Sequence, residues 1–220
     1  MPSDDLLAAT DSTDLPPKRP RGRPRKTEDE RDDGNRRHAL LQAAAQLFRR
    51  KGFAATTTRD IAAAADMQSG SPFYHFKSKD ALLYAVMEEG MQRAIARQQL
   101  AMAASLPEGD ARAQLHSLVR AHFDMLHGPG NDFIPVMLYE HRSLNARQRT
   151  ALAQLQIAYE AVWTPVLQAL HTSGQLRAPV KLSRLLMLGA LNWSVQWFDR
   201  SKEASLDDLA DAAVALFLKG

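Results

Sequence analysis

The sequence of 220 residues contains no cysteine, few aromatic residues and no long uninterrupted apolar run. Without cysteine, the chain can form no disulfide, no thiolate metal site and no cysteine nucleophile, which fits a reducing cytosol. The longest apolar stretch, residues 182–198, is interrupted by Arg184, Asn192 and Gln196 and is too polar to cross a bilayer. The acidic first residues lack the apolar core of a signal peptide. These absences favour a cytoplasmic protein without a membrane segment.

The alternation of apolar and polar residues that is typical of strands is also missing. Apolar residues instead recur at helical spacing, and alanine and leucine are abundant. We therefore expect an all-α fold, with a kink at Pro165 because proline cannot continue a regular helix. The expected helices cover residues 33–51, a short segment after Thr57, 69–76, 79–104, 110–127, 133–142, 146–172, 182–199, and a last segment from Ser205 to Leu218.

Basic residues are concentrated in the first part of the chain. The formal charge of the whole chain is +3, and residues 33–93 hold nine basic against six acidic side chains. A dense basic cluster, KRPRGRPRK, precedes this region at residues 18–26. Clustered cations beside a folded domain are the electrostatic footprint of a nucleic-acid binder. We expect a disordered arm over residues 1–32, a basic helical domain over 33–93 and a second helical domain over 94–220.

Two short expected helices with a tight turn between them follow a longer helix, as in a helix-turn-helix. Thr57 and Asp60 predict a capped start for the first short helix, and Asp66 predicts the turn because aspartate tolerates the left-handed conformation. The second short helix would enter the major groove. Candidate DNA contacts are Thr57, Thr58, Lys77 and Lys79 on phosphates, and Gln68, Ser69, Gly70, Ser71, Tyr74 and His75 near base edges.

The stretch from Leu40 to Leu83, LLQAAAQLFRRKGFAATTTRDIAAAADMQSGSPFYHFKSKDALL, resembles the DNA-binding domain of the TetR family. Many anchors occur in order, among them Phe48, Gly52, Thr57 and the pair His75-Phe76. The resemblance implies a homodimeric repressor with two helix-turn-helix units on a palindromic operator. The chain departs from the family pattern at Asp66, which replaces a glycine, and at Pro72 and Phe73, which replace a leucine and a tyrosine.

The basic arm contains Arg21-Gly22-Arg23-Pro24, which resembles the core of an AT-hook. Glycine lets such a backbone approach the floor of the minor groove, proline keeps it extended, and Arg21 and Arg23 would meet the negative potential of A·T-rich DNA. The alternative is a solvated tail that adds only non-specific attraction to phosphates.

In the second domain, the family resemblance implies an effector pocket and a four-helix dimer interface built from the last two helices. Those helices carry apolar residues on more than one face, which fits an interface, although they could also complete the monomer core. Asn192 stands out because a polar amide on an apolar helix needs a partner. For the other pocket candidates, core packing is the alternative. The candidates are Phe123, Phe133, Met137, Tyr139, Arg142, Trp163, Asn192, Trp193 and Trp197.

Two segments suggest an effector class. Residues 189–199, GALNWSVQWFD, and residues 139–149, YEHRSLNARQR, resemble the TetR branch that responds to acyl-CoA thioesters. Arg142, Arg147 or Arg149 could then meet the CoA phosphates. Two alternatives stay open. The effector could be a drug-like or aromatic compound, with Glu140 or Glu160 facing a cation, or the protein could be an architectural DNA-binding protein that needs no ligand.

The sequence gives no support for an enzyme. His116, His122 and His127 lack the spacing that places two metal ligands on one helical face. There is no strand followed by a glycine-rich phosphate loop, and no serine lies in a nucleophile elbow. We therefore expect a ligand-responsive transcriptional regulator, with no metal and no cofactor, whose partners are operator DNA, a small effector and a second copy of the chain.

Overall fold

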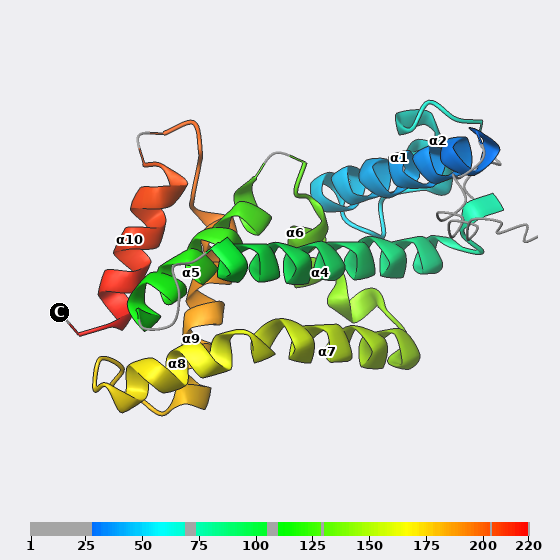
Figure 1. Cartoon of the computed structure of the whole chain (residues 1–220). Helices are drawn as coiled ribbons and strands as arrows, with labels where there is room; N and C mark the ends of the chain where they lie inside the picture. Colours follow the sequence, from blue (N-terminus) through cyan, green and yellow to red (C-terminus); the bar gives the residue numbers. More distant parts are fainter. Residues whose placement is uncertain (1–27, 69–73, 105–109, 129, 203, 220) are drawn as a thin grey trace, which may run out of the picture.

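The computed structural model describes residues 28–68, 74–104, 110–128, 130–202 and 204–219. In these ranges the regular structure is entirely helical, which confirms the all-α class (Figure 1). None of their helices is long and apolar enough to span a membrane. The helices are α1 (Glu28–Lys51), α2 (Thr58–Ala64), α4 (Lys79–Ala104), α5 (Ala111–His127), α6 (Phe133–Glu140), η1 (His141–Ser143), α7 (Ala146–Ala161), α8 (Trp163–Thr172), α9 (Val180–Trp193), η2 (Ser194–Gln196) and α10 (Leu206–Phe217).

The long helix α4 is the spine of the molecule and runs through both of its halves (Figure 1). At one end it packs against α1, which also holds α2. Further along, α4 packs against α6 and α5 on one side and against α7 on the other. The remaining helices complete the second half, with α8 between α5 and α9, and α10 against α5. Any tilt of α4 relative to the second half would therefore move α1 and α2.

Helix α1 buries the apolar face that its sequence predicts. Leu40, Leu41, Ala44 and Phe48 are almost fully buried. Gly52 ends the helix in the left-handed conformation, with φ +81, and its N–H donates to the Phe48 carbonyl at 2.9 Å. The helix begins at Glu28, five residues earlier than expected. No proline lies between Pro24 and Glu28, so nothing in this part of the sequence prevents the earlier start.

At the kink expected from Pro165, the helix is interrupted at one residue between α7 and α8, Val162, which keeps helical backbone angles of φ −66 and ψ −32. Helix α7 ends at Ala161, Val162 forms a turn, and α8 starts at Trp163. Pro165 has no N–H to donate to the carbonyl four residues earlier, which is that of Ala161, and its ring would clash with that carbonyl. The interruption therefore falls where proline chemistry places it.

Two other helices end sooner than expected. The helix expected over 182–199 starts at Val180 and gives way at Trp193 to the short 3-10 helix η2. Here the Ser194 hydroxyl donates back to the Leu191 carbonyl at 2.6 Å and competes with the helical ladder. The helix expected over 133–142 ends at Glu140 and continues as η1. The last helix starts as expected, with Ser205 and Asp208 forming a capping box.

Candidate functional site

Helix α2 begins with the predicted capping box. The Thr57 hydroxyl accepts a hydrogen bond from the Asp60 N–H at 3.1 Å, and the Asp60 carboxylate accepts one from the Thr57 N–H at 3.0 Å. The hydrogen bonds from Thr57 hold the pKa of Asp60 below its usual value. Thr57 is exposed, and its hydroxyl hydrogen remains available to a phosphate. Thr58, the first residue of the helix, is half-buried.

A tight turn follows α2, as the sequence predicts. Asp66 adopts a left-handed conformation with φ 56, and the Met67 N–H donates to the Ala62 carbonyl at 2.9 Å. Gln68 is exposed directly after this turn. Several expected DNA contacts lie outside the described residues, namely Arg21 and Arg23 of the basic arm, and Ser69, Gly70 and Ser71 of the second short helix, together with Pro72 and Phe73.

The end of the second short helix presents some of its expected side chains and covers another. Tyr74 is 81% exposed and Lys77 is also exposed, so both are free to meet DNA. His75 was expected on the outer face, and this placement is wrong. Its side chain is only 7% exposed, with Nδ1 3.8 Å from a carboxylate oxygen of Asp33. Asp33 belongs to α1, so this contact joins His75 to α1.

Lys79 is also engaged within the protein and does not extend freely toward a phosphate. Its ammonium donates to the carbonyls of Phe53 and Thr56, both at 2.9 Å, and lies 4.2 Å from the centre of the Phe53 ring. These carbonyls belong to the segment between α1 and α2. Lys79 thus ties the start of α4 to the segment before α2, and its expected contact with a DNA phosphate stays a prediction.

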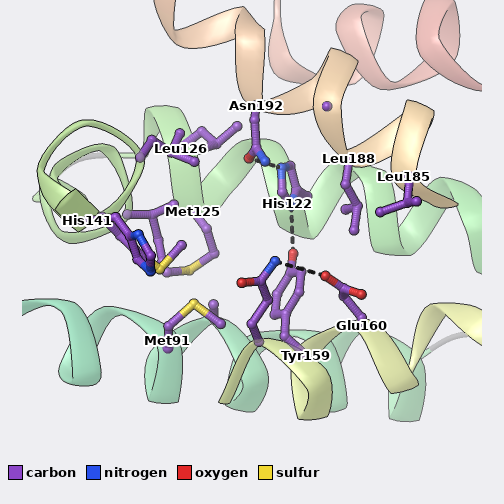
Figure 2. Close-up of a pocket in the computed structure, with 16 residues that line it drawn as sticks. Met91, His122, Met125, Leu126, His141, Tyr159, Glu160, Leu185, Leu188 and Asn192 are labelled. Carbon is purple, nitrogen blue, oxygen red and sulfur yellow. Dashed lines mark hydrogen bonds between the residues drawn. The ribbon is translucent and has the colours of Figure 1, made fainter. Parts of the chain in front are cut away.

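The second half of the molecule contains a cavity of about 420 Å³. Its wall is mainly apolar, with three methionines, and polar groups gather at two places (Figure 2). The lining residues are Met91 and Ala94 of α4; His122, Met125 and Leu126 of α5; Ile134, Met137 and Leu138 of α6; His141 of η1; Gln156, Tyr159 and Glu160 of α7; and Leu185, Leu188, Gly189 and Asn192 of α9.

Of the nine predicted pocket residues, the structure brings Met137 and Asn192 to the cavity wall. The other seven lie elsewhere. The cavity is lined by residues of several helices that are distant in the sequence, so the apolar pattern of one helix does not show which of its residues reach it. Phe123, Phe133 and Trp163 are core residues, while Tyr139, Arg142, Trp193 and Trp197 are exposed. The indole of Trp163 points into the core, and the Phe133 ring lies 4.6 Å beneath the guanidinium of Arg93.

A chain of uncharged hydrogen-bonding groups runs from the cavity into the core. One atom of the Asn192 amide lies 3.1 Å from His122 Nε2, and His122 Nδ1 lies 2.6 Å from the Tyr159 hydroxyl (Figure 2). One polar atom of the Gln98 amide is 2.7 Å from both the Tyr159 hydroxyl and the Trp163 indole nitrogen, and the other is 3.1 Å from the Tyr159 carbonyl. Because an indole N–H only donates and a carbonyl only accepts, the first of these atoms is the Gln98 oxygen.

Burial determines the protonation states of His122 and Tyr159 in this series of hydrogen-bonded groups. It lowers the pKa of His122 from 6.5 to about 4, and it raises the pKa of Tyr159 far above its usual value of 10. Both side chains are therefore uncharged at neutral pH. Sequence reasoning missed both residues, because His122 was considered only as a metal ligand. A histidine within the apolar face of α5, near the buried Leu118 and Leu126, was the available signal.

The second group of polar side chains at the cavity wall contains an ion pair between Glu160 and Arg184. The Glu160 carboxylate lies 3.2 Å from the Arg184 guanidinium and accepts a hydrogen bond from the Gln156 amide at 3.0 Å. A second nitrogen of Arg184 donates to the Thr164 hydroxyl at 2.8 Å. The charge of Glu160 is thus compensated. Within the residues that the structure describes, histidine, aspartate and glutamate side chains form no group of three that could hold a metal ion.

One helix of the cavity wall, α6, also contacts the segment between α1 and α2. Helix α6 carries Met137 and Leu138 on the cavity, and its last residue, Glu140, accepts a hydrogen bond from the Phe53 N–H at 2.8 Å. At the other end of α6, Asp132 pairs with Arg49 of α1 at 2.7 Å. One short helix therefore joins the cavity to the helix-turn-helix unit.

This arrangement of a helix-turn-helix unit, a spine helix and a cavity within a helical domain defines a class of DNA-binding transcriptional regulators. Comparison with known families agrees. Residues 40–86 match the family of bacterial regulatory proteins named tetR, and residues 108–220 match the tetracyclin repressor-like C-terminal domain. The chain belongs to the TetR family of transcriptional regulators.

Relatives and solved structures match along most of the chain. The transcriptional repressor KstR2 of Rhodococcus jostii is 28% identical over 200 residues, which cover 90% of this chain and 96% of KstR2. The crystal structure of the superantigen PfiT aligns with a TM-score of 0.70 and 38% identity, covering 84% of this chain and 96% of PfiT. AibR in complex with isovaleryl coenzyme A and operator DNA aligns with a TM-score of 0.74 and 21% identity, covering 83% and 97%.

Proposed function

We propose that the protein is a homodimeric repressor in the cytoplasm that binds a palindromic operator and releases it when an acyl-CoA thioester enters the cavity. The observation that carries this proposal is the contact of α6 with both the cavity and the α1–α2 segment through Glu140. A ligand that displaces α6 would disturb the segment that positions α2. Such a ligand shifts the population toward a state in which the two recognition helices no longer match successive major grooves.

The proposed DNA surface consists of exposed groups around α2 and the helix after it. Thr57 and Thr58 lie at the start of α2, where the helix dipole favours a phosphate. Gln68 and Tyr74 are exposed on either side of the recognition segment, and Lys77 follows as a free cation. Arg21, Arg23, Ser69, Gly70 and Ser71 complete the proposed surface, the arginines in the minor groove and the others near base edges.

The cavity suits the acyl part of a thioester. Its wall is dominated by methionine, leucine and isoleucine side chains, which adapt to flexible chains. The fold relative AibR has been solved with isovaleryl coenzyme A, which supports this class of ligand. Arg142 is exposed beside His141, which lines the cavity, so Arg142 could bind CoA phosphates outside it.

The proposed dimer interface is the apolar outer face of α9 and its surroundings. Leu182, Leu185, Leu186 and Trp193 are between 51% and 66% exposed along α9, and Leu216 of α10 is 78% exposed. Large apolar side chains gathered in this way mark an interaction site. A second copy of the chain would cover them and set the spacing of the two helix-turn-helix units.

An electrophoretic shift assay with the DNA upstream of the protein's own coding region tests the proposal. We expect tight binding that long-chain acyl-CoA abolishes. Tyr74→Ala should weaken operator binding about tenfold or more, because the 81% exposed side chain belongs to the proposed DNA surface and its removal leaves the core intact. Ile157→Ala, at a 61% exposed position on α7 away from that surface, should bind normally. Binding that ignores acyl-CoA would discard the effector class, and equal binding to all DNA would favour an architectural protein.

A further inference from the structure

The polar chain in the cavity ends in a group with unused hydrogen-bonding capacity. At its inner end the chain is closed, since the Gln98 oxygen faces two donors and its NH₂ group faces the Tyr159 carbonyl. Since the Tyr159 hydroxyl donates to Gln98, His122 donates from Nδ1 to Tyr159 and accepts at Nε2, so the Asn192 group that faces Nε2 is the NH₂ group. Asn192 forms one hydrogen bond among the described residues, the one with His122. The other atom of its amide group forms no hydrogen bond with a described residue. This amide lines the cavity and is half-buried.

The cavity wall offers no counter-ion to a buried anion. No lysine or arginine lines it, and the guanidinium of Arg184 behind the wall is already paired with Glu160. His122 is 5% exposed and its ring faces only uncharged partners. His141 is the remaining histidine of the wall, and it lies exposed on η1. A carboxylate placed beside Asn192 would lose its hydration without gaining a cation, which is strongly unfavourable.

The exposure of the lining residues shows which end of the cavity opens to solvent and which end is buried. His141 and Gln156 are exposed and lie outside the proposed dimer face of α9, so the mouth lies at η1 and α7. Met91, Ala94, Met125, Leu126 and Tyr159 form the buried part. In Figure 2 the His122 ring lies between Asn192 and Tyr159, while Met125 lies to the left of them beside His141, with Met91 below. A ligand that enters at the mouth reaches Asn192 with its apolar part, and its charged group stays outside.

We propose that the effector carries a neutral oxygen, as a hydroxyl or a carbonyl, on the part of the molecule that enters the cavity, and that Asn192, held by His122, binds this oxygen. The inference rests on the proposed function for the identity of the cavity as the effector site. A hydroxyl satisfies the free oxygen of the amide, and a carbonyl accepts the second N–H of its NH₂ group. A plain hydrocarbon leaves the amide unsatisfied, and a carboxylate lacks a counter-ion. The site therefore discriminates by polarity as well as by size.

The test measures binding to the free protein, separately from release of DNA. The probes are decanoyl-CoA and its ω-hydroxy and ω-carboxy derivatives, with decane, decanol and decanoate as a second series without CoA. Binding is followed by the rise in melting temperature on titration. We expect the hydroxylated member of each series to bind about tenfold or more tightly than the hydrocarbon member, and the carboxylated member to bind most weakly.

Two variants assign the preference to the amide. In Asn192→Leu the amide is replaced by an apolar side chain of similar size. This variant should bind the hydrocarbon member of each series at least as tightly as the hydroxylated member. Gln154→Leu removes an exposed amide of α7 that does not line the cavity and should keep the wild-type order. Equal binding of the three members of both series by the wild type would overturn the inference, even if Asn192→Leu does not fold. Binding with the expected order but without loss of DNA would instead overturn the proposed function and leave the inference standing.

Discussion

Lys79 uses its ammonium group inside the protein, where it satisfies two carbonyls of the α1–α2 segment. Lys79→Met keeps the apolar stem and removes the donor. We expect a loss of about 1–3 kcal/mol in the free energy of unfolding, because part-buried carbonyls lose their partner. Urea denaturation measures this, with the exposed Lys77→Met as a control that should change stability by less than about 0.5 kcal/mol. Equal stability of the two variants would contradict the structural role of Lys79.

His122 makes the stability of the protein depend on pH. Burial lowers its pKa from 6.5 to about 4, so the unfolded chain binds a proton in a range where the folded protein does not. The stabilisation is complete above pH 6.5 and is lost as the pH falls toward 4. This corresponds to about 2 kcal/mol between pH 7 and pH 5. In urea denaturation, the free energy of unfolding should fall less between pH 7 and pH 5 for His122→Gln than for the wild type. An equal fall in both proteins would contradict the role of His122 in the pH dependence.

At the scale of elements, α6 connects the cavity with the helix-turn-helix unit. Glu140→Ala removes the acceptor of the Phe53 N–H and leaves the cavity wall unchanged. We expect operator binding to persist while the concentration of acyl-CoA that releases DNA rises about tenfold, since the coupling between sites in such proteins is about 1–3 kcal/mol. Shift assays across an acyl-CoA titration measure this.

Ser143→Ala is the matched control for this link. Ser143 donates to the other oxygen of the Glu140 carboxylate and forms no hydrogen bond with α1 among the described residues. The control should respond to acyl-CoA like the wild type. A normal response of Glu140→Ala would show that the signal travels by another route, such as the packing of α4 against α5 and α7.

At the scale of the whole molecule, the exposed apolar face of α9 is the proposed dimer interface. Leu186 is 66% exposed and does not line the effector cavity. We expect Leu186→Glu to convert a dimer into a monomer and to weaken operator binding strongly, since two half-sites then bind independently. Sedimentation velocity measures the mass. Ile157→Glu, on the 61% exposed Ile157 of α7, should remain dimeric, and dissociation of this control instead would place the interface on α7.

Local chemistry explains which features of the fold could be predicted. The capping boxes at Thr57 and Ser205, the left-handed Asp66 and the interruption before Pro165 each depend on a few neighbouring residues. The helix ends that were misplaced depend on competition. At Ser194, for example, a hydroxyl bonds to a nearby carbonyl and diverts the chain from the α-helical ladder.

By itself, the sequence determined the all-α class, the order of the helices and the family, because periodicity, caps and ordered motifs are local properties of the chain. Only the tertiary structure decided that His75 and Lys79 face inward, that Met137 and Asn192 alone among the expected residues reach the cavity, and that His122 joins Asn192 to Tyr159. The physical reason is that these contacts join residues far apart in the sequence, so they exist only once the helices have packed together.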